Sequence, residues 1–310
     1  MDKGYADTVR LLLTVAPEVF ANDTFAMKGG TAINLFVEDM PRLSVDIDVV
    51  FQPRQMPRDE ALAAIDAELT AIARRVEKLG LRTRALRRAD GGDTKLIVEN
   101  DAAQVKIEVN TVFRGTLLPV QRRPLNAKTA DLFGVEFDTP ILARDELYAG
   151  KLVAAFDRQH PRDLFDVWQL YRSGGLTDGM LECFVVYLAG HNRPPHEVLF
   201  GNDKDIAAEY DRTFVGMTEV PCPLDTLLGA RAQLRDELPH RLTARHRRFL
   251  SGLVRANPDW SLMQYPHTAE LPALRWKLTN LETFRQRRPA DFHAQAEALD
   301  AGMARFKAPD

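Results

Sequence analysis

Two aspartates near the start of the chain have the spacing of a metal-binding pair. In residues 44–51, apolar side chains alternate with Asp46 and Asp48, which predicts a strand with one buried and one acidic face. Side chains at i and i+2 of a strand share a face about 6–7 Å apart, so both carboxylates can converge on one Mg²⁺ ion, with Asp46 able to bridge to a second. Two such ions, about 3.5–4 Å apart, stabilise the attacking and leaving oxygens of a phosphoryl displacement.

Upstream of these acids, a glycine turn has the composition of a phosphate-binding site. Gly29 and Gly30 precede Thr31, which we place near the N-terminus of a helix. Glycine lets the backbone approach a phosphate closely, and the first amides of a helix favour an anion. Ser44 lies on the acidic face of the following strand by alternation. A phosphate turn followed by paired acids predicts a site for a nucleoside triphosphate.

A third acid can be assigned to the same site from another alternating segment. Residues 105–109 predict a further strand of the sheet, and Glu108 falls on its acidic face. Taken singly, an Asp-x-Asp sequence is most often a solvated strand face, and a Gly-Gly pair is most often a plain turn. Their combination in this order favours a binding site with Asp46, Asp48 and Glu108 as the metal ligands.

The elements that must position these residues change in type along the chain. Up to about residue 143, the patterns predict a helix over 5–15, a turn and helix over 26–36, a helix over 58–79, and strands over 44–51, 81–89, 94–99, 105–109 and, at an edge, 135–142. The sequence Asp-Gly-Gly-Asp at 90–93 is expected to be a hairpin turn. From Arg144 onward, helical patterns separated by prolines dominate. We therefore predict an α+β fold, with a small mixed-sheet domain over 1–143 and an all-helical domain over 144–310.

Composition limits the classes of partner. The 310 residues include 41 basic and 44 acidic side chains, which excludes a generally basic protein that coats nucleic acid. Locally basic segments occur at 241–255, at 275–288, and in a cluster of Arg82, Arg84, Arg87 and Arg88. Each alone is more often a solvated face; around one cleft they would follow an RNA backbone. The three tryptophans, at 168, 260 and 276, are expected in the core.

The apolar segments and the two cysteines of the sequence predict a cytoplasmic protein. No apolar run approaches the roughly 20 residues that a membrane helix needs, so no membrane partner is expected. Cys183 and Cys222 have no neighbours at metal-ligand spacing, which argues against a zinc site or a disulfide framework.

Three motifs resemble those of a known enzyme family. Residues 28–32 (Lys-Gly-Gly-Thr-Ala) with 42–49 (Arg-Leu-Ser-Val-Asp-Ile-Asp-Val) resemble the signature of DNA-polymerase-β-like nucleotidyltransferases. More narrowly, they are similar to the AbiEii/MenT nucleotidyltransferase toxins of bacterial toxin–antitoxin and phage-defence systems. Residues 151–155 (Lys-Leu-Val-Ala-Ala), Arg158 and 161–166 (Pro-Arg-Asp-Leu-Phe-Asp) are similar to the lysine helix and the following acidic helix of that family. A weaker match is Leu-Pro-Ala-Leu-Arg-Trp-Lys-Leu at 271–278, with Asn280 and Leu281.

The resemblance implies an activity and roles for further residues. The α-phosphate of a nucleoside triphosphate would be attacked by an RNA hydroxyl, such as that of a tRNA 3′ end, with Mg²⁺ bound and translation inhibited. Asp46, Asp48, Lys151 and Asp166 would be catalytic; the nucleotide would be bound by Gly29, Gly30, Thr31, Ser44, Lys151 and Arg158. A cognate antitoxin would be a partner.

Three other interpretations remain open on the sequence. Lys151 and Arg158 lie on one helix face, and they could form a structural ion-pair network with Asp163 and Asp166 instead of contacting a triphosphate. The acceptor could also be a protein or small-molecule hydroxyl, or the chain could be a catalytically silent nucleotide-binding module. The intact pair of Asp46 and Asp48 argues against the silent module.

Overall fold

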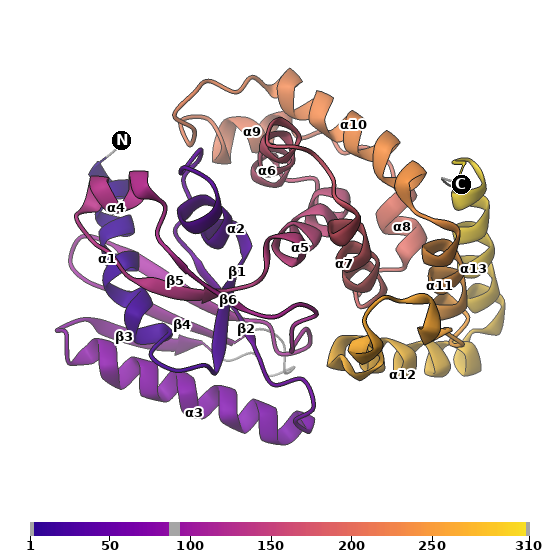
Figure 1. The fold of residues 1–310 in the computed structure, drawn as a ribbon, viewed down its shortest axis with the longest axis horizontal. Coiled ribbons are helices and arrows are strands. Elements are labelled where there is room, and N and C mark those ends of the chain that lie inside the picture. Colours follow the sequence, from indigo (N-terminus) through magenta and orange to yellow (C-terminus); the bar gives the residue numbers. More distant parts are fainter. Residues whose placement is uncertain (1–2, 87–93, 308–310) are drawn as a thin grey trace. The chain divides into compact units, whose positions relative to one another are not determined.

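The computed structural model describes residues 3–86 and 94–307, which divide into two compact units, Met1–Leu147 and Tyr148–Asp310. The first unit is built on a mixed β-sheet, and the second consists of helices (Figure 1). The predicted α+β fold class is therefore confirmed. The division falls inside helix α5 (Arg144–Asp157). The predicted hairpin turn at 90–93 and the basic residues Arg87 and Arg88 lie outside the described residues.

Strands from both ends of the first unit form one sheet of seven strands. Its order is β3-β4-β5-β2-β1-β7-β6, with bounds β1 Phe25–Lys28, β2 Ile47–Phe51, β3 Arg82–Leu86, β4 Thr94–Glu99, β5 Gln104–Val109, β6 Gln121–Pro124 and β7 Asp138–Ile141. Strand β2 lies centrally, antiparallel to β1 and parallel to β5. Ile47 and Val49 on β2, and Ile107 on β5, are buried, as alternation predicts. The centre of the sheet thus carries both strands that bear the predicted metal ligands.

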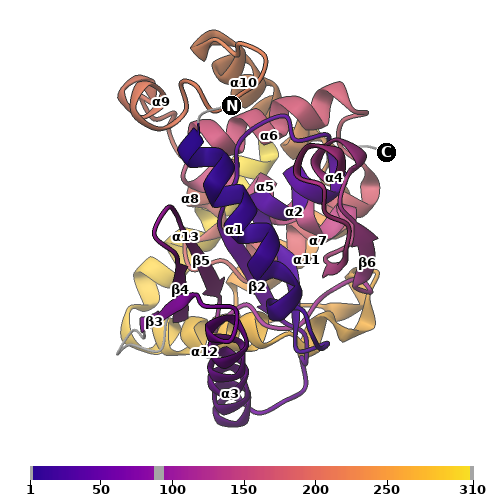
Figure 2. The ribbon, with the colours of Figure 1, turned by 90° about the vertical axis from the view of Figure 1, so that its left-hand side faces the viewer.

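Two long helices cover the apolar side of these strands. Helix α1 (Lys3–Val19) lies against β5 and against α3 (Arg58–Glu77), which also contacts β3 and β4 (Figure 2). The buried residues of α3 recur at helical spacing: Ala61, Ile65, Leu69, Ile72 and Val76. The same unit contains α2 (Gly29–Ala32), a π-helical turn (Ile33–Val37) and α4 (Ala127–Phe133).

Two predictions about the strands were wrong. Strand β2 begins at Ile47 rather than at residue 44, so Asp46 immediately precedes the strand. The strand predicted at an edge near 135–142 is β7, and it lies inside the sheet between β1 and β6. The edge position belongs to β6, whose Gln-Arg-Arg-Pro sequence has no apolar alternation to reveal it. An edge strand pairs on one side only and needs no buried side chains, so its sequence carries little signal.

The second unit follows the helical segments expected from the sequence. Its helices are α5, α6 (Pro161–Arg172), α7 (Asp178–Ala189), α8 (Pro195–Phe200), α9 (Ala207–Thr213), α10 (Leu224–Arg241), α11 (Ala244–Val254), α12 (Pro272–Arg287) and α13 (Pro289–Ala304), with 3₁₀ turns at Trp260–Leu262 and Pro266–Glu270. Pro239, expected between helices, lies in the last turn of α10. Among the described residues, no helix is both long and apolar enough to cross a membrane.

Candidate active site

The glycine turn, which is the start of α2 directly after β1, lies against the acidic strand. Gly29 has a φ of 76°, in the left-handed region that favours glycine. A Cβ atom at Gly29 would overlap the Oδ2 atom of Asp48. One at Gly30 would lie 2.6 Å from Nη2 of Arg42 and 3.0 Å from Oγ of Ser44. At Gly29 an added Cβ would displace the Asp48 carboxylate, and at Gly30 it would press on the end of the Arg42 side chain. The turn, Asp48, Ser44 and Arg42 thus form one closely packed cluster.

Hydroxyl groups connect this turn to the segment that carries Asp46. Oγ1 of Thr31 donates a hydrogen bond of 2.6 Å to the backbone carbonyl of Asp46. Because that donation uses the only hydroxyl proton of Thr31, Oγ of Ser44, 3.0 Å away, must be the donor to Thr31 Oγ1. Thr31 is buried, with an exposed fraction of 1%. In this arrangement Thr31 and Ser44 brace the backbone beside Asp46, and their contact with a nucleotide stays a prediction.

Asp48 belongs to a row of charged residues that crosses four neighbouring strands. The register pairs Lys28 with Asp48, Asp48 with Glu108, and Glu108 with Lys95. Paired residues of neighbouring strands point to the same side of a sheet, and all four are partly exposed. Two carboxylates thus lie side by side at the centre of the row, with one cation at each end.

The sheet register places two of the three predicted metal ligands, Asp48 and Glu108, side by side. Nζ of Lys95 lies 2.7 Å from Oε1 of Glu108, so the third acid is engaged by a cation. Among the described residues, no three His, Cys, Asp or Glu side chains are arranged to hold a metal ion together. Asp46 and Asp48, both partly exposed, fit Mg²⁺, which proteins usually hold through one or two carboxylates plus substrate phosphates. The role of Glu108 stays a prediction.

The second unit contains the cluster of Lys151. Nζ of Lys151 lies 2.8 Å from Oδ1 of Asp163 and 3.0 Å from Oδ2 of Asp166, which joins α5 to α6. Arg158 also binds Asp163 through both Nε and Nη2. Lys151, Asp163 and Asp166 are 7%, 0% and 2% exposed. The ion-pair network left open by the sequence is therefore present, and contact of Lys151, Arg158 or Asp166 with a nucleotide stays a prediction.

The charge state of Asp163 follows from this network. Burial alone raises the pKa of the Asp163 carboxyl, but the charge of Lys151 and the hydrogen bonds from Arg158 outweigh it and hold the pKa well below its usual range. Asp163 is ionised throughout the physiological range. It fixes the ends of both cationic side chains, so it is a positioning residue, a role that the resemblance to the family did not imply.

Two further side chains that support the glycine turn and the segment packed on it were not singled out from the sequence. Nδ2 of the fully buried Asn34 donates to the carbonyl of Gly30 at 2.8 Å, and its Oδ1 accepts from the backbone of Arg42 at 3.3 Å. The hydroxyl of Tyr5 on α1 accepts from the backbone of Ser44 at 3.1 Å. Burial raises the pKa of Tyr5 to about 12. The sequence signal available was the lone amide of Asn34 within an apolar run.

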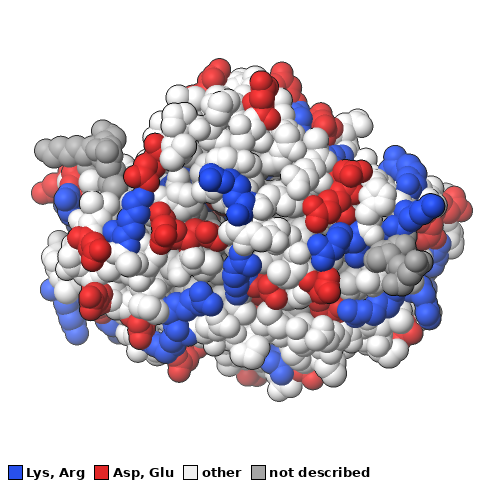
Figure 3. Space-filling view, turned by 45° about the horizontal axis from the view of Figure 1, so that its top comes forward, with Lys and Arg blue, Asp and Glu red and all other residues white. Residues whose placement is uncertain are grey.

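Several basic side chains of the segments 241–255 and 275–288 bind other protein groups inside the second unit. Arg245 forms an ion pair with the buried Glu182 at 2.6 Å. Arg247 donates to backbone carbonyls, including those of Pro239 and Met303 at 2.8 and 2.9 Å. Lys277 is 8% exposed and donates to the carbonyls of residues 191–193, and burial lowers its pKa to about 8. The basic segments are therefore partly structural, and on the face in Figure 3 charges of both signs are intermingled.

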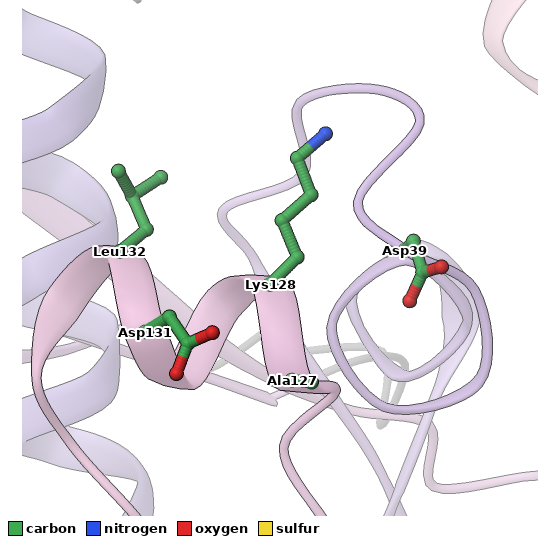
Figure 4. A pocket seen from close by; sticks show the side chains of 5 residues that line it. All are labelled: Asp39, Ala127, Lys128, Asp131 and Leu132. Carbon is green, nitrogen blue, oxygen red and sulfur yellow. The ribbon is translucent and has the colours of Figure 1, made fainter.

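Two hollows in the surface of the described residues are lined by other side chains. One of about 610 Å³, beside α4, is lined by Asp39, Ala127, Lys128, Asp131 and Leu132 (Figure 4). Another of about 400 Å³ lies between α7, α10 and α11 and is lined by residues that include Asp178, His240 and His246. Neither contains a residue predicted for nucleotide or metal binding.

Comparisons with known proteins match the chain to one family. The profile of the family described as nucleotidyl transferase AbiEii toxin, type IV toxin–antitoxin system, matches residues 10–280. Among solved structures, the chain is similar to MenT4, a nucleotidyltransferase toxin from Mycobacterium tuberculosis H37Rv, with 15% identity and a TM-score of 0.46 over 99% of this chain and 96% of that one. A search of curated proteins found no match.

Proposed function

The chain belongs to the AbiEii nucleotidyltransferase toxin family of type IV toxin–antitoxin systems, and we propose that it transfers a nucleoside monophosphate from a nucleoside triphosphate to an RNA hydroxyl. The expected acceptor is the 3′ end of tRNA, with inhibition of translation, including during phage infection, as the consequence. Membership of this family implies a nucleotide substrate and an antitoxin partner. The reaction forms a bond between the acceptor oxygen and the α-phosphorus, breaks the α–β phosphoanhydride, and releases pyrophosphate and the hydroxyl proton.

One observation carries the proposal: the Gly29 backbone lies against the carboxylate of Asp48. A phosphate bound by the backbone of this turn would therefore lie beside the carboxylate of Asp48, which together with Asp46 would hold Mg²⁺. When bound, the ion would stabilise the negative charge that develops on the phosphoryl oxygens. Thr31 and Ser44 would keep the Asp46 backbone in place through their hydroxyl contacts.

Lys151 would act near the triphosphate only within its ion-pair network. An ammonium has three donors, and Asp163 and Asp166 occupy two of them. We assign Lys151 and Arg158 to charge on the leaving pyrophosphate, because positioned cations stabilise phosphoryl transfer. Asp166 would then orient Lys151.

The test is transfer of label to RNA. Purified protein, Mg²⁺, each α-labelled nucleoside triphosphate and total bacterial RNA are incubated, and Asp48→Asn is compared with Asp131→Asn, an exposed aspartate on α4. We expect label in a discrete RNA band for wild type and Asp131→Asn, and its loss by at least about 100-fold in Asp48→Asn. Label on protein or on a small molecule would show that the accepting hydroxyl belongs to that molecule and not to RNA. No transfer under any condition would overturn the proposal in favour of a silent module.

A further inference from the structure

Helix α12 has one side inside the second unit and one side in solvent. Ala273, Leu274, Lys277 and Leu281 are buried, and the helix contacts α7, α13 and the 3₁₀ turn at Pro266–Glu270 (Figure 1). The burial of these four residues accounts for the lysine and for three of the apolar positions of the 271–281 motif, while Leu278 is half-buried. It leaves Trp276 and Asn280 of that motif unexplained, because both are exposed.

The exposed side carries a stripe of side chains suited to a nucleic acid. Trp276, Asn280, Thr283 and Arg287 follow each other at i, i+4, i+7 and i+11, which places them within about 60° of one another around the helix. The stripe is about 16 Å long at 1.5 Å per residue. Trp276 is 50% exposed, so the expectation that it lies in the core was wrong. Trp168 and Trp260 are half-buried and pack on Phe165 and Phe249.

The exposed residues of α12 carry an excess of positive charge, and one of the arginines, Arg287, lies on the stripe itself. Between residues 275 and 288 the only acid is Glu282, and Arg275, Arg285 and Arg287 are all exposed. Within the described part of the chain, Arg285 and Arg287 have no ion pair or hydrogen bond that would engage them structurally, whereas Arg288 is paired with Asp291. Arginines of the neighbouring segment, such as Arg245, are held by protein partners.

We infer that the exposed side of α12 binds a single-stranded segment of RNA, an inference that rests on the proposed function and extends it to the acceptor. A base would stack on the indole of Trp276, the amide of Asn280 would hydrogen-bond a base edge, and Arg287 would contact a phosphate. A protein or membrane surface fits less well, because Trp276 is the only large apolar side chain on an otherwise polar and cationic stripe.

The test is binding of a fluorescein-labelled 12-nucleotide single-stranded RNA to the full chain, without nucleoside triphosphate, at several salt concentrations. Trp276→Ala should raise the Kd roughly 5- to 100-fold with an unchanged salt slope, because it removes a stacking surface but no charge. Trp276→Phe should restore most of the affinity. Arg287→Gln should lower the slope of log K against log salt by about 0.7.

Arg285→Gln is the matched control, since Arg285 has the same charge on the same helix but lies on the side opposite Trp276, nine residues along. It should bind RNA as wild type does. Equal losses for Arg285→Gln and Arg287→Gln, or wild-type binding by Trp276→Ala, would overturn the inference. So would variants at Trp276 that bind RNA normally but fail to bind a purified protein partner.

The outcome is separable from that of the proposed function. Asp48→Asn, which should lose transfer, should bind this RNA with the affinity of the wild type. Transfer to RNA that does not depend on Trp276 would leave the function standing and refute the α12 surface. Binding that depends on Trp276, in a protein that transfers no nucleotide, would support the surface and refute the function.

Discussion

Replacement of Gly29 by alanine separates backbone strain from displacement of the catalytic acid. At a φ of 76° an alanine is disfavoured by about 1–2 kcal/mol, because its Cβ crowds the following carbonyl. At Gly29 the same Cβ would also overlap Oδ2 of Asp48, so the carboxylate must move. We expect Gly29→Ala to lower the free energy of unfolding by at least about 1–2 kcal/mol and to lower transfer by about 100-fold or more.

Gly134→Ala is the control for strain alone. Gly134 ends α4 with a φ of 65°, so an alanine there is disfavoured for the same reason. A Cβ at Gly134 would meet no heavy atom of the described chain within 4 Å. We expect a loss of about 1–2 kcal/mol in the free energy of unfolding with transfer unchanged.

Both variants are compared by urea denaturation and by initial rates of label transfer at saturating nucleotide. The free energy of unfolding reports strain in both proteins, and the rate reports the position of Asp48 in Gly29→Ala only. A Gly29→Ala protein that transfers label at the wild-type rate would refute the argument that the turn positions this carboxylate.

Two further predictions concern the hydroxyl brace and the ion-pair network. Thr31→Val should lower the free energy of unfolding by about 1–3 kcal/mol, since the carbonyl of Asp46 loses its hydrogen-bond donor, and it should slow transfer. Thr14→Val on α1 is the control, because the Thr14 hydroxyl bonds only its own helix, and its transfer rate should be unchanged. Equal transfer rates in the two variants would contradict the bracing role of Thr31. The pKa of Asp163 is lower in the folded state than in the unfolded chain, where it is about 3.9. Its ionised carboxylate therefore stabilises the fold above that pH, and this stabilisation is lost as the pH falls toward the folded-state pKa. Lys151→Met should lower the free energy of unfolding by about 3–5 kcal/mol at neutral pH, since it leaves two buried acids short of a cation. Between pH 5 and 2.5, this free energy, measured by urea denaturation, should fall less steeply in Lys151→Met than in the wild type. Parallel pH dependences of the two proteins would contradict this prediction.

Much of the first unit could be predicted because its signals are local. Alternation placed Ile47, Val49 and Ile107 inside. Helical spacing of apolar residues identified α3, and four of them, Ile65, Leu69, Ile72 and Val76, are buried. Gly29 and Gly30 were singled out by composition alone. These features depend on residues near one another in the chain, so their spacing carries the information.

The partners of the predicted site residues could not be read in the same way. Alternation put Glu108 on the acidic face, but the register between β4 and β5 decided that Lys95 engages it. The sequence allowed Lys151 two roles, and the packing of α5 on α6 placed it between two acids. Asn34 gave only the weak signal of one amide in an apolar run, because its bonds to the glycine turn depend on how the chain folds back.

By itself the sequence determined the family motifs, the faces of the central strands and the change from a mixed sheet to helices. Only the tertiary structure decided which residues of the site meet: Asp48 and Gly29, Glu108 and Lys95, and Lys151 and Asp163. The reason is that periodicity records the side of an element on which a residue lies. The neighbour on that side is set by sheet order, register and helix packing, which join residues far apart in the chain.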